Sequence, residues 1–400
     1  MEHNKLIFSK VPTLRFAEYT DEWHIYALSD FVTRITRRNK NNESSLPLTI
    51  SAQYGLVDQI TFFNKTVASV DLSGYYLLYN GDFAYNKSYS NDYAWGAVKR
   101  LDKYEKGCLS SLYFVFRPTD KVDSDYLTHY FETNKWHKGI SDIAGEGARN
   151  HGLLNMAVDD YFATKHYLPS LSEQKKIACF LNLITKRIEI QNKIISKYET
   201  LIKGLSCDYF SKQPNHIAKL KDLIIKGKAG GTPSSTIAEY YNGNIPFLSI
   251  SDMTRQGKYV EFTEKHISEN GLANSSAWIV PSNSLILSMY ASVGLVCINK
   301  VPLATSQAMF SMVLKDCNML DYIYYYLNFF RETQIHRLLE TGTQSNINAD
   351  TVRDIEIPFY SNILVFVKTL QAIENRLNNE KDMLSRLMDL KTYLLSSLFI

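Results

Sequence analysis

The sequence predicts an α+β protein: two tandem α/β domains separated by a long antiparallel two-helix coiled coil, arranged as a pseudo-two-fold repeat. Three observations support this fold class. The two halves share an ordered internal repeat, each half contains short β-rich runs, and each half ends in a long heptad pattern. We expect the first domain at residues 1–168, the first long helix at 169–211, the second domain at 212–358 and the second long helix at 359–400.

Short segments of the first half recur in the same order in the second half. The matched pairs are 28–31 with 220–223, 46–51 with 245–251, 125–127 with 321–323, 147–150 with 342–346, and 168–169 with 357–358. Each match is weak alone, but a shared order is hard to obtain by chance. The chain therefore looks like a duplication, in which each half should fold in a similar way.

Local patterns indicate mixed secondary structure within each half. Residues 111–116 and 284–288 are rich in β-forming side chains and lie next to Gly, Asn or Pro turn signals, so they predict strands. Residues 125–139 and 321–339 predict helices. The globular part of each half is therefore expected to be α+β.

The long helices give the clearest signal. The Ser170-x-x-Glu173 pattern after Pro169 is typical of a capping box and predicts a helix start. Mostly apolar positions then follow at +4, +3 spacing, as in a coiled-coil seam. They are Ile177, Leu181, Ile184, Ile188, Gln191, Ile195, Tyr198, Ile202 and Leu205 in the first helix, and Phe366, Leu370, Ile373, Leu377, Glu380, Leu384, Leu387, Lys391 and Leu394 in the second. The polar members Gln191 and Glu380 coincide, so we expect them to set the register of two paired helices. The alternative is that each helix packs only on its own domain.

Composition excludes several classes of protein. The 400 residues are 45% hydrophobic and 21% charged with a net charge of +3, which is ordinary globular composition. We expect no transmembrane helix, no secretory signal and a cytoplasmic location. The five scattered cysteines argue against a disulfide framework or a zinc ribbon.

Catalytic motifs are missing from the sequence. There is no phosphate-binding or dinucleotide-binding glycine motif, no Asn/Asp-Pro-Pro-Tyr/Phe run and no paired histidine metal motif. The Glu173-x-Lys175 spacing falls in the first turn of a long helix, where we interpret it as a cap and a solvated surface. We therefore expect no catalysis, no cofactor and no metal.

Polar and basic clusters occur at matched places in both halves and suggest DNA binding. The candidate residues are Arg34, Arg37, Arg38, Asn39, Lys40, Arg149 and Asn150 in the first half, and Lys226, Lys228, Gly230, Gly231, Thr232, Thr343, Gln344, Ser345 and Asn346 in the second. Basic side chains and exposed glycine amides suit phosphates, while Arg and Asn suit base edges. Such clusters are more often solvated surfaces, but their recurrence favours DNA. Two domains held apart by a rod would recognise a bipartite duplex site.

Several stretches resemble a known family. Residues 229–234, 244–253, 291–294, 302–307 and 355–358 are similar to the target-recognition domain of type I restriction–modification specificity (S) subunits. In the first half, residues 168–178 are similar to the junction between domain and helix in this family. The resemblance covers nearly the whole chain and includes the duplication.

The resemblance implies a non-catalytic subunit that binds double-stranded DNA and two methyltransferase (M) subunits, which carry S-adenosylmethionine and methylate adenine. ATP-dependent motor-nuclease (R) subunits would add cleavage of unmodified DNA. Each domain would recognise one half of an interrupted sequence, and the helices would set the gap. The methyltransferase would dock on the helices, with Glu173 and Gln174 as candidate contacts.

This chain departs from the family pattern in two places. Arg37, Arg38 and Asn39 stand where the second domain has Gly-Gly-Thr-Pro, so the phosphate contacts of the two domains should differ. The second junction, residues 358–363, lacks the Glu-Gln pair. Two alternatives remain open: a recognition subunit of a related methylation or defence complex without the motor, and a coiled-coil adaptor that does not bind DNA.

Overall fold

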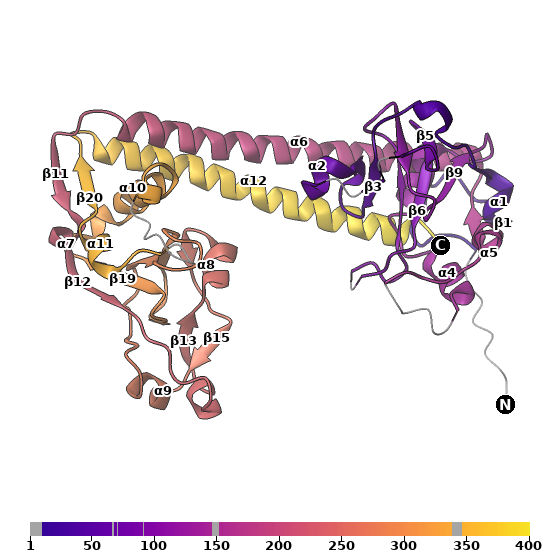
Figure 1. Ribbon diagram of the computed structural model, residues 1–400. Coiled ribbons are helices and arrows are strands. Elements are labelled where there is room, and N and C mark those ends of the chain that lie inside the picture. Colours follow the sequence, from indigo (N-terminus) through magenta and orange to yellow (C-terminus); the bar gives the residue numbers. More distant parts are fainter. Residues whose placement is uncertain (1–9, 66–67, 70, 91, 146–151, 338–345) are drawn as a thin grey trace. The chain divides into compact units, whose positions relative to one another are not determined.

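The computed structural model describes residues 10–65, 68–69, 71–90, 92–145, 152–337 and 346–400. The chain forms two compact units (Figure 1). Unit 1 comprises Met1–Asn192 with Asp382–Ile400, and unit 2 comprises Lys193–Lys381. Each long helix is therefore shared between the units: α6 (Leu171–Phe210) begins in unit 1, and α12 (Ile363–Ser397) begins in unit 2.

Unit 1 is built around a four-stranded antiparallel sheet of order β2-β9-β6-β7, flanked by three two-stranded sheets. The four strands are β2 (Val32–Arg34), β9 (Phe114–Pro118), β6 (Phe83–Asn86) and β7 (Ala97–Arg100). The two-stranded sheets are β1 (His24–Ala27) with β10 (Lys165–Leu168), β3 (Leu48–Ser51) with β4 (Gly55–Asp58), and β5 (Tyr76–Tyr79) with β8 (Lys106–Leu109). The helices are α1 (Leu28–Phe31), η1 (Lys40–Asn42), α2 (Gln59–Phe63), α3 (Ser124–Tyr130), α4 (His137–Ile143) and α5 (Val158–Ala163).

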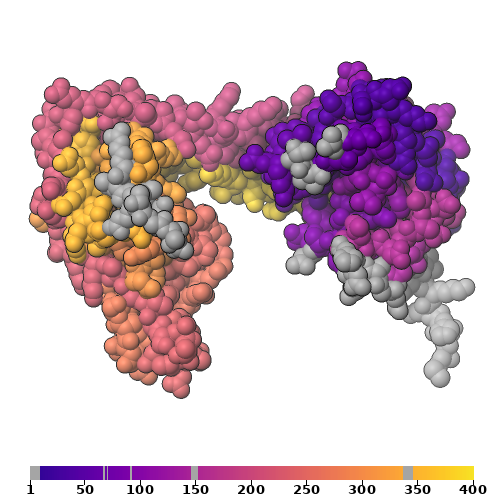
Figure 2. Space-filling view, in the orientation of Figure 1, coloured from indigo at the N-terminus to yellow at the C-terminus, as the bar shows by residue number. Residues whose placement is uncertain are grey.

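Unit 2 is built around a five-stranded sheet of order β12-β19-β16-β17-β14. Its strands are β12 (Ile224–Ala229), β19 (Met309–Leu314), β16 (Leu285–Ser288), β17 (Val296–Asn299) and β14 (Tyr259–Val260). The smaller sheets are β15 (Lys265–Ile267)-β13 (Ile245–Leu248)-β18 (Ala304–Thr305), and β11 (His216–Lys219) with β20 (Glu356–Phe359). The helices are α7 (Leu220–Leu223), η2 (Ala238–Tyr241), α8 (Ile250–Gln256), α9 (Glu269–Ala273), η3 (Cys317–Met319), α10 (Leu320–Thr333), η4 (Ile335–Arg337) and α11 (Ala349–Arg353). In the space-filling view, the segment around α9 and β15 forms the tip of this unit (Figure 2).

The two units repeat one topology, which confirms the predicted duplication. In each, the first strand pairs antiparallel with the strand that precedes the long helix, β1 with β10 and β11 with β20. A four-residue helix follows that first strand, α1 in unit 1 and α7 in unit 2. The order β2-β9-β6-β7 then corresponds to β12-β19-β16-β17, with β14 added parallel to β17. The predicted α+β class with long helices is confirmed.

The heptad pattern of both long helices is matched by their burial. Every seam position of α6 and α12 is buried or half-buried, including Gln191, while most residues between them are exposed. Within unit 2, the rings of Tyr209 and Phe366 stack at 3.8 Å, and Lys381 pairs with Glu199 at 2.9 Å. The end of α6 thus meets the start of α12, so these segments run antiparallel.

Unit 1 contains the complementary halves of the same two helices. Ile177 and Leu181 of α6 share one hydrophobic core with Leu394 of α12 and with Phe399. The start of α6 therefore packs with the end of α12, and both pack on the domain. Packing on the domain and pairing of the helices occur together, rather than as alternatives. None of the described helices is long and apolar enough to cross a bilayer.

Two local expectations were wrong. The helix expected at 125–139 is split into α3 and α4, because the chain turns where the Thr133 hydroxyl donates to the Tyr130 carbonyl and the His137 amide donates to the Asn134 carbonyl. Within 111–116, the strand begins only at Phe114.

The start of α6 also differs in detail from the expected cap. The Ser170 hydroxyl accepts the Glu173 amide at 3.4 Å, as in a capping box. The Glu173 carboxylate instead accepts two hydrogen bonds from the guanidinium of Arg15, at 2.7 and 2.8 Å. Glu173 and Gln174 are each only 1% exposed. The expected solvated surface is therefore wrong at these two positions.

Candidate nucleic-acid interface

One end of the five-stranded sheet in unit 2 gathers several of the candidate segments. The register pairs Ala229 of β12 and Leu287 of β16 with Phe310, near the start of β19. The chain segments that leave β12 and β16, and those that enter β19 and β17, therefore meet at one end. This sheet end carries residues 230–232, 289–294 and 305–307.

The Gly-Gly-Thr segment follows β12 directly and packs against the loop before β19. The Gly230 amide donates to the Met309 carbonyl at 3.1 Å, and the Gly231 amide donates to the Thr305 carbonyl at 2.9 Å. A Cβ on Gly230 would lie 1.9 Å from the Thr305 carbonyl oxygen. Both glycines are buried, and their amides are satisfied within the protein. The expectation of exposed glycine amides is therefore wrong, because close packing of two loops requires glycine here.

Beside these glycines the sheet end presents polar side chains. Thr232 is exposed, and its hydroxyl donates to the side-chain oxygen of Gln307 at 2.5 Å. The loop after β16 is held by the Ser288 hydroxyl, which is close to the carbonyl oxygens of Tyr290 at 2.6 Å and Ala291 at 2.8 Å. Tyr290 is 42% exposed at this loop. Hydroxyl, amide and aromatic groups of this kind are suited to phosphate and base contacts.

The segment before α11 is anchored to the same loop. The Ile347 amide donates to the carbonyl of Met289, the first residue after β16, at 3.1 Å. Asn346, which precedes it, is half-buried. Three further candidates of this segment, Thr343, Gln344 and Ser345, lie outside the described residues.

Unit 1 repeats this anchor at the equivalent place. Lys87 is the first residue after β6, and its carbonyl accepts the Leu154 amide at 3.0 Å. The sheet correspondence of the two units pairs β6 with β16, so Lys87 corresponds to Met289 and Leu154 to Ile347. The candidates Arg149 and Asn150 precede this anchor and lie outside the described residues. Thus the two polar segments matched in sequence precede equivalent anchors in the two units.

Residues 34–40 contain the first basic cluster. Within it, the side chains of Arg37 and Asn39 bind other residues of unit 1. The Arg37 guanidinium pairs with Asp82 at 2.8 Å, and the Asp82 side chain is wholly buried. Asn39 is also wholly buried, with its side-chain amide donating to the Ser44 carbonyl at 2.9 Å and its oxygen accepting the Ser44 amide at 3.0 Å. Asn39 therefore shapes the loop, and a direct base contact from it is contradicted by its burial.

Other members of the first cluster present charge at the surface. Arg34 ends β2 and is 3.7 Å from the exposed carboxylate of Asp159, which is a weak surface pair. Lys40 is exposed in η1. Arg38 lies 4.2 Å over the ring of Tyr76. Arg34 and Lys40 are consequently the best placed of this cluster for phosphate contacts.

The lysines of β12 allow two interpretations. Lys226 and Lys228 are both exposed, and β12 is an edge strand of its sheet. The ammonium of Lys226 lies 4.1 Å over the ring of Trp278. Lysines on an edge strand prevent unwanted strand pairing, and they also supply positive charge to a surface. The exposed Lys226 and Lys228 can therefore both protect the strand edge and add positive charge to the surface.

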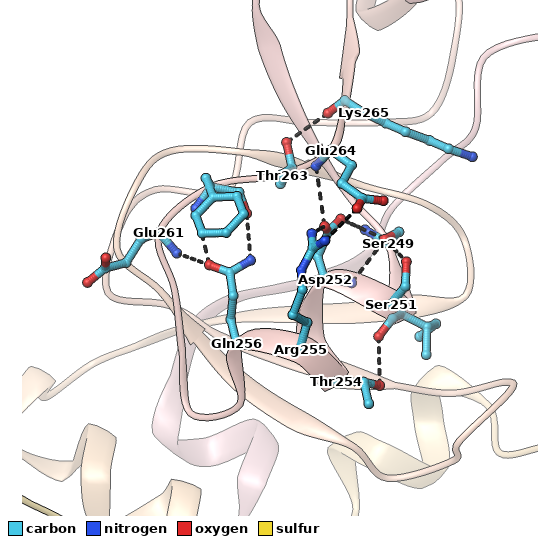
Figure 3. A network of polar contacts seen from close by, with 12 residues as sticks. Ser249, Ser251, Asp252, Thr254, Arg255, Gln256, Glu261, Thr263, Glu264 and Lys265 are labelled. Carbon is cyan, nitrogen blue, oxygen red and sulfur yellow. Dashed lines mark hydrogen bonds and ion pairs between the residues drawn. The ribbon is translucent and has the colours of Figure 1, made fainter. Parts of the chain in front are cut away.

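A compact polar network surrounds α8 (Figure 3). The wholly buried Asp252 accepts from the Ser249 hydroxyl at 2.6 Å and pairs with Arg255 at 3.0 Å. Arg255 also pairs with Glu264 at 2.5 Å. Asp252 lies within one of the segments resembling the specificity-subunit family, but its carboxylate is occupied by intramolecular partners. Its role is to fix α8 on the chain segment before β15.

Sequence reasoning did not propose Tyr290, Gln307 and Lys87 as candidates. Tyr290 and Gln307 lie next to or within segments of the family resemblance, so that resemblance was the available signal. Lys87 carries no motif, and only the topological correspondence of the two units identifies it. Its half-buried ammonium lies 4.8 Å over the ring of Phe114, and burial lowers its pKa.

A known protein family is similar to part of this chain. Residues 214–381 match the family model described as the type I restriction modification DNA specificity domain. This part of the chain is similar to a type I DNA specificity domain. It coincides with the globular part of unit 2 and the start of α12.

Curated proteins similar to this chain are named type I specificity subunits. The chain is 30% identical over 147 residues to the MjaIX specificity subunit of Methanocaldococcus jannaschii, covering 36% of this chain and 34% of the relative. It is 31% identical over 180 residues to the HindI specificity subunit of Haemophilus influenzae, covering 43% and 38%. These alignments thus span little more than a third of the relatives' own length.

Solved structures show the same fold over almost the entire chain. A chain from a type I restriction–modification system has a TM-score of 0.58 at 16% identity, covering 94% of this chain and 97% of its own. The type I S subunit of M. genitalium has a TM-score of 0.56 at 15% identity, covering 98% and 99%. At these identities the likeness concerns the fold.

Proposed function

We propose that this chain is the DNA-recognition subunit of a type I restriction–modification complex. The observation that carries the proposal is the specificity-domain match over residues 214–381, together with the equivalent sheet end in unit 1. On this proposal, each unit recognises one half of an interrupted duplex site. The polar segments at the two sheet ends supply the contacts.

The proposed partners are those that the family resemblance of the sequence implies. Two methyltransferase subunits would carry the catalytic site and the S-adenosylmethionine, and motor-nuclease subunits would add ATP-dependent cleavage. This chain would itself be non-catalytic and would act in the cytoplasm. The burial of Glu173 and Gln174 affects one part of this model: their side chains are engaged with Arg15, Asp123 and Pro169. A docking partner would therefore contact the exposed residues around them.

The decisive experiment maps methylated adenines in a host that expresses the methyltransferase with and without this chain. We expect an interrupted motif to be methylated only when the chain is present. A methyltransferase that modifies the same motif without this chain would contradict the proposal.

The phosphate contacts have their own test. Each lost phosphate contact lowers the slope of log affinity against log salt by about 0.9. The double variant Arg34→Ala, Lys40→Ala should lower this slope by about 2 for the assembled complex. Lys138→Ala, at an exposed pair with Asp142 on α4, is the matched control and should leave the slope unchanged. Equal slopes in all three proteins would remove Arg34 and Lys40 from the interface.

Two other functions make different predictions. A recognition subunit of a complex without the motor would give the same methylation but no cleavage of unmodified DNA when all neighbouring gene products are supplied. A structural adaptor would show no salt-dependent DNA binding with the methyltransferase present. The specificity-domain match favours recognition over the adaptor.

A further inference from the structure

In unit 2, a carboxylate at the start of α10 is bound by a side chain of the long helix α12. The Gln371 amide nitrogen donates to Asp321 Oδ2 at 2.8 Å. The ammonium of Lys258, next to β14, contacts Asp321 Oδ1 at 2.8 Å and Glu374 of α12 at 2.7 Å. The Tyr325 hydroxyl donates to the same Glu374 carboxylate. The sheet, the domain helix and the long helix thus share one polar cluster.

In unit 1, a carboxylate at the equivalent place makes the equivalent contact. Asp125 lies in the first turn of α3, and its Oδ2 accepts the Asn182 amide of α6 at 2.8 Å. The Arg100 guanidinium, at the end of β7, binds Asp125 Oδ1 at 2.7 Å. The Asn182 oxygen lies 2.8 Å from His129 Nε2 of the same domain helix. Again a strand, a domain helix and a long helix are joined.

The two clusters occupy matching positions in the repeat. Asn182 directly follows the seam residue Leu181, and Gln371 directly follows the corresponding seam residue Leu370. Asp125 and Asp321 belong to the matched segments 125–127 and 321–323. The cation differs, since Arg100 comes from β7 and Lys258 from the residue before β14. The carboxylate–amide contact is therefore the feature common to both units.

We propose that these carboxylate–amide pairs, Asp125–Asn182 and Asp321–Gln371, are positioning clamps that fix the angle of each recognition domain on its long helix. The clamp would control which gap lengths the protein tolerates, and it would leave the choice of bases unchanged. The gap claim rests on the proposed function, whereas the angle claim stands on the structure alone.

The chemistry of the cluster suits this role. Burial alone would raise the pKa of Asp321, but the hydrogen bond and charge of Lys258 outweigh it and the pKa is lowered. Burial would lower the pKa of Lys258, but Glu374 and Asp321 outweigh it and the pKa is raised. Both groups are therefore charged at neutral pH. Hydrogen bonds to charged groups are among the stronger ones in proteins, and they are directional, so they hold an angle that apolar packing alone leaves looser.

The angle is tested by a distance between the domain and the long helix of unit 2. Spin labels are placed at Asn270→Cys in α9 and Lys368→Cys in α12, in the full chain with the exposed Cys179, Cys207 and Cys317 changed to serine. The unaltered clamp should give a narrow distance distribution. Gln371→Glu sets two carboxylates side by side and should broaden or shift it.

A charge swap supplies the rescue. Asp321→Asn combined with Gln371→Glu exchanges carboxylate and amide, keeps the total charge and restores one hydrogen bond. We expect the double variant to recover the narrow distribution. The control Asn379→Ala changes an exposed amide on the same helix and should have no effect. The clamp proposal would be overturned if Gln371→Glu left the distance distribution unchanged. It would also be overturned if the double variant did not restore the narrow distribution.

The gap preference is measured separately, by selecting bound sites from a random duplex library with the assembled complex. For Gln371→Glu, discrimination between the best gap and a gap one base pair longer should fall about tenfold, as the loss of a hydrogen bond to a charged group allows. The bases of both half-sites should be unchanged. If Gln371→Glu broadened the distance distribution but left the discrimination between gap lengths unchanged, the gap claim would be refuted. The clamp would then hold the domain on the helix without affecting gap preference. If the unaltered protein selected no motif, the proposed function would fail, while the distance measurement would still decide the clamp.

Discussion

For several polar residues, hydrogen-bond and ion-pair partners within the protein decide whether the side chain is available for DNA contact. Asn39 and Glu173 are polar residues that a sequence reader would place at a surface, but they are 0% and 1% exposed. Each is engaged by protein groups: Asn39 holds a loop through Ser44, and Glu173 pairs with Arg15. By contrast Arg34, Lys40, Lys226 and Lys228 keep their charged groups at the surface, as DNA contact requires.

Gly230 permits the first prediction at this scale. Gly230→Ala places a Cβ against the Thr305 carbonyl, and overpacking of this kind costs about 1–3 kcal/mol. We expect the free energy of unfolding to fall by that amount in a denaturant titration. The neighbouring Lys228→Ala, at an exposed position, should change it by less than about 0.5 kcal/mol. Equal effects of the two substitutions would show that the loop relaxes around the new methyl group.

Glu132 permits a prediction on pH. Burial would raise the pKa of this carboxyl, but a hydrogen bond with His129 and the nearby Lys391 lower it from 4.5 to about 2. A carboxyl with a depressed pKa in the folded state stabilises the protein above its unfolded pKa, and this contribution is lost as the pH falls through the folded value. Unfolding free energy should therefore decrease from about pH 4.5 towards pH 2, by up to about 3 kcal/mol from this group.

The measurement is a set of denaturant titrations at pH 7, 4.5 and 3. Glu132→Gln should be less stable than the parent protein at pH 7, and the difference should shrink at acid pH. Asp142→Asn removes a carboxylate from an exposed ion pair in the same unit. The free energy of unfolding of this variant should change with pH in the same way as that of the parent protein. If the free energy of unfolding of Glu132→Gln also changed with pH in the same way as that of the parent protein, this carboxyl would not be the titrating group.

Among the elements, the long helices behave as their heptad pattern predicts. Their seam positions are covered along the entire length, and each half of a helix also joins the core of one domain. Gln191 is wholly buried in the seam of α6, and Glu380 of α12 pairs with Arg376 at 2.9 Å. The role of these two residues in setting the register stays a prediction.

The seam prediction concerns the matched polar pair, Gln191 and Glu380. Gln191→Leu with Glu380→Leu should preserve or raise the free energy of unfolding, because polar residues in a seam usually give specificity at a cost in stability. The register should loosen. A reporter disulfide between Glu199→Cys and Lys381→Cys, an ion pair within unit 2, should then form in lower yield. A double leucine variant that unfolds, or one that keeps the full disulfide yield, would count against this role.

At the scale of the molecule, the duplication is the main feature. Each unit has its own core, its own sheet end and its own carboxylate–amide contact with a long helix. Two copies of one architecture with different side chains suit the proposed recognition of two half-sites of different sequence. This supports independent recognition by the two units.

Domain replacement tests that independence. Exchanging residues 229–346 for the same segment of another specificity subunit should change one half of the methylated motif. The other half and the gap should persist, because on the proposed function they depend on unit 1 and on the long helices. Methylated-adenine mapping of the exchanged chain gives the answer. A change in both halves would show that the two units do not recognise DNA independently.

The sequence by itself determined the α+β class, the duplication and the long paired helices, because these depend on periodicity and order along the chain. It also located the exposed basic residues of η1 and β12. Only the tertiary structure decided that Gly230 and Asn39 are buried packing residues. It also decided that the Glu173 carboxylate binds Arg15 and that the Asp321 carboxylate accepts a hydrogen bond from Gln371. The physical reason is distance along the chain: Arg15 and Glu173 are separated by 158 residues, and Asp321 and Gln371 by 50. Burial and hydrogen-bond partners arise when such segments fold together, and no local pattern records them.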